Sequence, residues 1–312
     1  MSPTAGGPGD NEVTKEVAVN WRWPPPPGGG PGPYGPGNTA PRTGRPTLPE
    51  PPTDLVPTPH GVCLECLSTG AGDPVTVFAH GLANGIADTR PLGSAVAGRK
   101  VFFQFRGHGR SDAPSGPWTY LDLARDLRAV ADLSGATRAV GVSLGAAALC
   151  RLLADHPTRF DRVVFFLPAV LDTPRPEAAK ARLTALLAAV ESGEAAAVAD
   201  VVSMDTPPAL RDTPSAWSYI RQRTDQLLRD GLARGLATLP DQVAVTDRAQ
   251  LRAVRAPALV LGCRGDELHP ATVAEDLAGV LPQATLHVYD KPGVLWTQRA
   301  DLRARISEFL NG

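Results

Sequence analysis

A short stretch from Arg138 to Cys150, RAVGVSLGAAALC, places one serine between two glycines. The apolar residues before Gly141 favour a buried strand, and the small and apolar residues after Gly145 have helical spacing. In a Gly-x-Ser-x-Gly turn between a strand and a helix, the glycines let the two elements approach closely. The serine oxygen is then exposed above the sheet. Ser143 is therefore a candidate nucleophile for attack on the carbonyl carbon of an ester or thioester.

A serine nucleophile also needs donors for the developing oxyanion, a base, and a carboxylate that orients the base. VTVFAHGLANG, residues 75–85, is a strand pattern followed by a loop of small residues. We expect the backbone N–H groups of Leu82 and Leu144 to form the oxyanion hole. LVLGCRGDELHP, residues 259–270, is a late strand pattern that ends at Asp266, a suitable carboxylate.

The elements that must position these residues alternate along the chain from about residue 60. Continuous apolar strand patterns alternate with helix patterns, which predicts an α/β fold with a mostly parallel central sheet and helices on both faces. The strand patterns cover residues 61–69, 75–81, 100–107, 138–143, 162–170, 257–263 and 284–290. Residues 173–250 contain helix patterns without a convincing strand, and we expect them to form a helical lid over the strand ends. The predicted domain is 57–312, lid included.

The first 56 residues are of a different kind. They are dense in proline and glycine and have no periodic apolar face, so we expect a disordered tail. Trp21, Trp23 and the proline run 24–27 resemble ligands of SH3- or WW-like grooves. A solvated tail without a partner is the alternative, and the composition favours it.

Composition limits the remaining function classes. The 312 residues are 43% hydrophobic and 20% charged, with a net charge of −1, which gives no electrostatic basis for nucleic-acid binding. No apolar run approaches a membrane span and no signal peptide is evident, so we expect a cytoplasmic protein. Cys63 and Cys66 lie in a strand pattern that turns their side chains to opposite faces, so we expect neither a metal nor a cofactor.

Together, these motifs resemble the α/β-hydrolase superfamily over about residues 60–312. The order is the oxyanion loop, the Arg-Gly-His-Gly-Arg-Ser turn at 106–111, the serine turn, the lid and the late Asp. The resemblance implies that Ser143 is the nucleophile, Asp266 the acid, and Leu82 and Leu144 the oxyanion donors. In this family the catalytic histidine commonly follows the last strand, beside the nucleophile and the acid. Val294 stands there in this chain, and valine cannot accept a proton.

Another histidine must therefore serve if the serine is to be activated. The chain has six histidines, which are His60, His80, His108, His156, His269 and His287. We consider His269 the best substitute, because it lies three residues after Asp266 and is expected at the same end of the sheet. A packing role is its alternative, since related sequences often carry His-Pro after the acid. His80 and His108 lie in loops where this fold often has structural histidines.

We expect an enzyme that hydrolyses a small or medium apolar ester or thioester through Ser143, with an incomplete or atypical triad. Two alternatives stay open because the usual histidine is missing. One is a lyase or cyclase that uses the same fold without an acyl-enzyme. The other is an inactive protein that binds a ligand or a partner.

Overall fold

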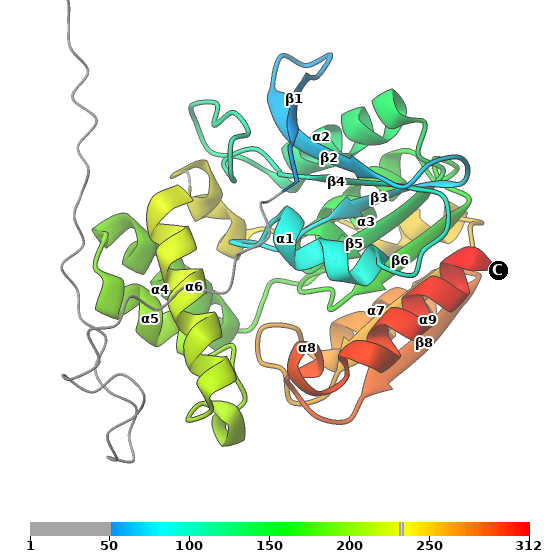
Figure 1. Cartoon of the computed structure of the whole chain (residues 1–312). Coiled ribbons are helices and arrows are strands. Elements are labelled where there is room, and N and C mark those ends of the chain that lie inside the picture. The colour runs from blue at the N-terminus through cyan, green and yellow to red at the C-terminus, as the bar shows by residue number, and fades with distance from the viewer. Residues whose placement is uncertain (1–50, 231, 233) are drawn as a thin grey trace, which may run out of the picture. The chain divides into compact units, whose positions relative to one another are not determined.

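The computed structural model describes residues 51–230, 232 and 234–312 (Figure 1). In this part of the chain, eight strands form one sheet in the order β1-β2-β4-β3-β5-β6-β7-β8. The strands are β1 (Asp54–Pro57), β2 (Cys63–Thr69), β3 (Val75–Ala79), β4 (Arg99–Phe103), β5 (Arg138–Val142), β6 (Arg162–Phe166), β7 (Ala258–Cys263) and β8 (Ala284–Tyr289). The antiparallel pairs are β1–β2 and β2–β4. Strands β3 to β8 are parallel to one another, so their carboxyl ends share one edge of the sheet.

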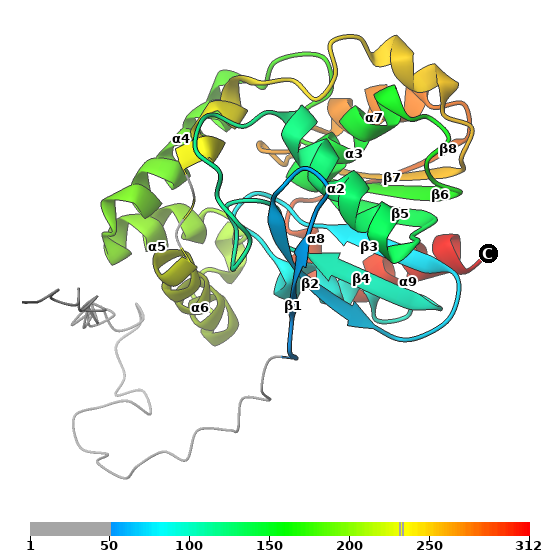
Figure 2. The same ribbon diagram turned by 90° about the horizontal axis from the view of Figure 1, so that it is seen from above.

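Helices cover both faces of the sheet (Figure 2). One face carries α2 (Tyr120–Ser134), α3 (Leu144–Asp155) and α7 (Ala271–Val280), and the other carries α1 (Ile86–Thr89) and α9 (Arg299–Asn311). The side chains of successive residues in β5 point to opposite faces of the sheet, as in any β-strand. Ala139 packs in the first core, and Val140 and Val142 pack in the second. The predicted α/β fold with a mostly parallel sheet is confirmed.

Three longer helices lie between β6 and β7. They are α4 (Glu177–Ser192), α5 (Ala195–Ser203) and α6 (Pro214–Asp230), all within the segment predicted as a lid. They gather at one end of the sheet (Figures 1 and 2). The buried Arg175 ties the start of this insertion to its end, because it donates to the carbonyls of Leu239 (3.0 Å) and Gln242 (3.1 Å). It also donates to the hydroxyl of Tyr120 on α2 (2.5 Å).

The amino-terminal boundary differs from the predicted one. Strand β1 begins at Asp54, inside the segment predicted as tail, and pairs with β2 from Asp54↔Cys66 to Pro57↔Cys63. The ordered domain therefore starts before residue 57. The rest of the predicted tail, with Trp21, Trp23 and the proline run 24–27, lies outside the described residues. None of the described helices combines the length and the apolar character needed to cross a membrane.

Candidate active site

The serine turn has the strained backbone that its sequence predicts. Ser143 stands between β5 and α3 with φ 49° and ψ −105°, a left-handed conformation that non-glycine residues rarely adopt. A Cβ on Gly145 would overlap the carbonyl oxygen of Ala79 on β3, and one on Gly141 would lie 2.6 Å from Gly145 O. Both positions therefore need glycine, and the tight packing holds the half-buried Ser143 side chain above the end of β5.

His269 lies between Ser143 and Asp266 and contacts both side chains. Its Nε2 lies 2.9 Å from Ser143 Oγ, and its Nδ1 lies 3.0 Å from Asp266 Oδ2. A carboxylate can only accept, so Nδ1 carries the proton and donates to Asp266. Nε2 then has a free lone pair and accepts a hydrogen bond from the Ser143 hydroxyl. This is the tautomer that a general base for Ser143 requires.

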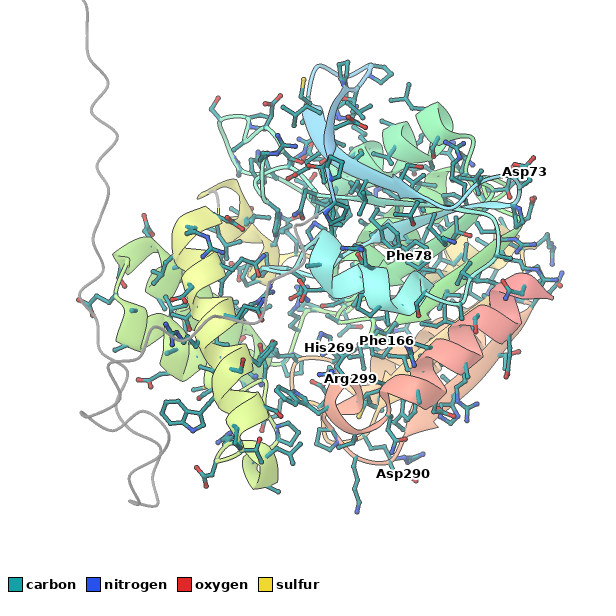
Figure 3. All side chains as sticks on the ribbon, viewed as in Figure 1. Asp73, Phe78, Phe166, His269, Asp290 and Arg299 are labelled. Carbon is teal, nitrogen blue, oxygen red and sulfur yellow. The ribbon has the colours of Figure 1, made fainter. Side chains whose placement is uncertain are left out.

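One turn after β7 presents both Asp266 and His269. Asp266 Oδ1 accepts hydrogen bonds from the backbone N–H groups of Leu268 (3.0 Å) and His269 (3.1 Å), which folds the chain back so that the imidazole meets Oδ2. Burial alone would raise the pKa of Asp266. The charge and hydrogen bonds of His269, with the N–H of Leu268, outweigh burial and lower the pKa below its ordinary value. Asp266 is therefore held as the carboxylate that a protonated imidazole needs beside it. Figure 3 labels His269 at the end of the sheet that faces the lid helices.

Val294 is a buried apolar residue and contributes no polar group to this arrangement. It opens the short helix α8 (Val294–Thr297), where its side chain is 3% exposed and packs in the apolar core with Tyr289 and Leu302. The imidazole beside Ser143 comes from the β7–α7 turn instead.

Two other histidines stabilise the loops around the serine. His80 is fully buried, accepts from the N–H of Phe105 (3.0 Å) and faces Gly81 O through Nδ1 (2.7 Å). His108 accepts from the N–H of Ala83 through Nε2 (3.2 Å). Burial lowers the pKa of His80 to about 4 and that of His108 to about 3. Both rings are therefore neutral near pH 7, and the sequence-based preference for structural roles fits this geometry.

The loop after β3 brings Leu82 close to the serine. Residues 81–84 form a turn in which Asn84 N–H donates to Gly81 O (3.1 Å), and Ala83 takes a left-handed φ of 58°. A Cβ on Gly81 would lie 3.4 Å from Ser143 Cβ, so the turn packs directly against the nucleophile. On the other side, Leu144 is the first residue of α3, where backbone N–H groups have no partner within the helix. Leu82 and Leu144 thus lie on the two loops from which an oxyanion hole can be built.

The lid adds polar and aromatic groups to these loops. Asp205, just after α5, accepts from Arg182 on α4 (2.7 Å) and interacts electrostatically with His269 and Arg223. Tyr219 of α6 meets the ring of Trp296 at right angles, with centroids 5.1 Å apart. Sequence patterns gave no sign of Asp205 or Arg223, because their approach to the site depends on how the lid folds back. Among the described residues, no group of three or more His, Cys, Asp or Glu could hold a metal ion.

Known proteins share this architecture. The α/β-hydrolase-fold family model matches residues 74–293. A Caulobacter segnis protein named as a carbamate hydrolase is 34% identical over 111 residues, 33% of this chain and 42% of that protein. Homoserine O-acetyltransferase of Deinococcus radiodurans is 26% identical over 216 residues, 62% of this chain and 64% of that protein. These matches therefore span less than two thirds of either relative.

A crystal structure of a hydrolase from Pseudomonas aeruginosa PA01 superposes on this chain with a TM-score of 0.69 and 25% identity, and the match covers 83% of this chain and 98% of that one. The family model, the sheet order and the serine turn agree, and the chain belongs to the α/β-hydrolase-fold family.

Proposed function

We propose that this protein hydrolyses small carboxylic esters or thioesters through Ser143, with His269 as general base and Asp266 as its orienting acid. One observation carries the proposal. The imidazole of His269 lies within hydrogen-bond reach of both Ser143 Oγ and the Asp266 carboxylate. With that base in reach, the missing histidine at position 294 no longer argues for an inactive binding protein.

The geometry supports an acyl-enzyme mechanism. Ser143 Oγ attacks the carbonyl carbon while its proton passes to His269 Nε2, and the negative charge of Asp266 stabilises the imidazolium. The N–H groups of Leu82 and Leu144 would bind the oxyanion of the tetrahedral intermediate. The intermediate collapses, the C–O or C–S bond breaks, and His269 returns the proton to the leaving alcohol or thiol. A water molecule then gives a proton to His269 and attacks the acyl-serine. The bond to Ser143 Oγ breaks, His269 returns that proton to Ser143 Oγ, and the carboxylic acid leaves.

The relatives support acyl chemistry at this site. The two proteins are named for cleaving a carbamate and for transferring an acetyl group, and both reactions occur at a carbonyl carbon. Water and an alcohol compete for an acyl-enzyme, so a transferase would share the first half of the proposed mechanism. We favour hydrolysis because the solved relative from Pseudomonas aeruginosa PA01 is a hydrolase. A cytoplasmic location remains a prediction from the sequence.

Turnover of p-nitrophenyl acetate, butyrate and octanoate tests the proposal. The wild-type chain should release p-nitrophenol from at least the shorter esters, and Ser143→Ala should release none above background. A fluorophosphonate should label the wild-type protein once per chain, at Ser143. Absence of both turnover and labelling would contradict the proposed function. Labelling without turnover in water, but with acyl transfer to an added alcohol, would favour the transferase.

A further inference from the structure

Arg223 of α6 connects the lid to the loop that follows β3. Its side chain is only 6% exposed. Nη2 donates to the carbonyl of Ala83 and to Oδ1 of Asn84, and Nη1 donates to Asp88 Oδ2 (3.2 Å). The acceptors lie in residues 81–88, roughly 140 residues away in the sequence, so the lid contributes a buried cation to this loop.

These bonds act on the turn that carries the proposed oxyanion donor. Gly81 O accepts from the backbone N–H of Asn84 and faces His80 Nδ1 at 2.7 Å. The Gly81–Leu82 peptide is planar, so the N–H of Leu82 points opposite to Gly81 O. The direction of Leu82 N–H therefore depends on where Asn84 lies, and Arg223 holds Asn84 and Ala83.

The turn is held from two sides. From the body of the domain, His108 accepts the N–H of Ala83 (3.2 Å). From the lid, Arg223 binds the carbonyl of the same residue, whose left-handed φ of 58° is unfavourable for alanine. A strained turn persists only where its surroundings determine it from several directions.

We propose that Arg223 is a positioning residue that couples the helical lid to the oxyanion hole. When α6 is in place, its guanidinium fixes the Ala83–Asn84 segment, and Leu82 N–H points to where the oxyanion develops. When the lid moves away, the turn loses this support. This inference rests on the proposed ester hydrolysis and adds that the lid helps to assemble the site.

Arg223→Ala tests the coupling, with Arg221→Ala as the matched control. Arg221 lies on the same helix, is 68% exposed and pairs only loosely with Asp225 (3.9 Å). A displacement of about 1 Å in a catalytic group can cost roughly 100-fold, so we expect kcat of Arg223→Ala to fall about 10- to 100-fold. KM for p-nitrophenyl acetate should stay nearly unchanged, because a donor aimed at the oxyanion acts in the transition state.

Two further measurements separate positioning from a merely structural role. Added guanidinium ion should restore part of the kcat of Arg223→Ala and leave Arg221→Ala unaffected. Amide hydrogen exchange over residues 81–85 should be faster in Arg223→Ala than in Arg221→Ala. If Arg223→Ala does not fold, Arg223→Lys carries the test. Lysine keeps the positive charge, but its ammonium cannot reproduce the fixed directions of the several guanidinium N–H donors. The kcat of Arg223→Lys should therefore also fall.

The outcomes distinguish the two proposals. If the wild-type chain turns over none of the esters, the proposed function fails and the role of Arg223 fails with it. If the wild-type chain is active and Arg223→Ala matches Arg221→Ala in kcat and loop exchange, only the role of Arg223 is refuted. A loss of kcat that guanidinium does not rescue, without faster exchange in the loop, also refutes it.

Discussion

Replacing His269 by glutamine should show whether the turn after β7 supplies the base. Glutamine has a similar size and keeps a polar group beside Ser143, but it cannot take up a proton at neutral pH. The perturbation therefore removes the proposed general base, whose Nε2 lies 2.9 Å from Ser143 Oγ. General-base catalysis typically contributes about 10²- to 10⁴-fold, so kcat for p-nitrophenyl acetate should fall by that factor. At about 1.36 kcal/mol for each tenfold, the lost transition-state stabilisation is roughly 2.7–5.4 kcal/mol.

The companion variants use position 294, where the family usually carries the histidine. Val294 is buried in an apolar core, and an unpaired imidazole there should cost about 1–3 kcal/mol of unfolding free energy. Val294→His should not raise ester turnover, and the double variant His269→Gln/Val294→His should be as inactive as His269→Gln. His287→Gln, on β8, serves as the control and should keep wild-type kcat. Initial rates at saturating ester, with thermal unfolding of each variant, measure both effects.

Two results would refute this reasoning. The first is a His269→Gln variant that folds normally and keeps most of its kcat, because a different base would then activate Ser143. The second is recovery of turnover in the double variant. Recovery would mean that an imidazole at position 294 reaches Ser143 and can replace His269 as the base.

Three further predictions follow from the same contacts. Asp266→Asn should lower kcat by about 10⁴-fold while KM changes little, because the amide no longer holds the imidazole in the required tautomer or stabilises its charge. For His80 and His108, the unfolded chain takes up protons below about pH 6.5, whereas burial holds the folded pKa values at about 4 and about 3. The free energy of unfolding should therefore be highest above pH 6.5 and fall by up to about 2.7 kcal/mol per pH unit between pH 6.5 and 4, which urea denaturation at pH 7, 6 and 5 measures. Gly145→Ala should destabilise the fold by about 1–3 kcal/mol in the same denaturation assay, because its Cβ meets the Ala79 carbonyl, and an unchanged midpoint would show that β3 and α3 can separate at little cost.

Local patterns were sufficient to predict the parallel sheet and the serine turn. The central strands are buried on both faces, so their apolar runs are continuous. The Gly-x-Ser-x-Gly pattern indicates that β5, α3 and β3 approach so closely that only glycine fits at positions 141 and 145. Strand β1 was missed because Asp-Leu-Val-Pro is a short edge strand next to a proline-rich segment, where alternation cannot be recognised.

The site was harder to predict because part of it depends on tertiary structure. The Asp-x-x-His spacing pointed to His269 as a candidate base, but the following proline favoured a packing role. The difference lies in the turn, where Asp266 Oδ1 caps two backbone N–H groups and leaves Oδ2 to the imidazole. The contact of Arg223 with Ala83 leaves no local pattern at all, since it depends on how the lid folds back over the loop.

The short link between Asp266 and His269 changes which motions the site can tolerate. In the usual family arrangement the acid and the base stand on different loops, so three loops must hold their relative positions at once. Here the proposed acid Asp266 and the proposed base His269 share one hydrogen-bonded turn and should move together. A fluctuation of that turn changes the separation of Nε2 from Ser143 Oγ but hardly alters the pair itself. The chain after Pro270 then takes no part in proton transfer, and substitutions in β8 and α9 should affect activity only as far as they affect folding.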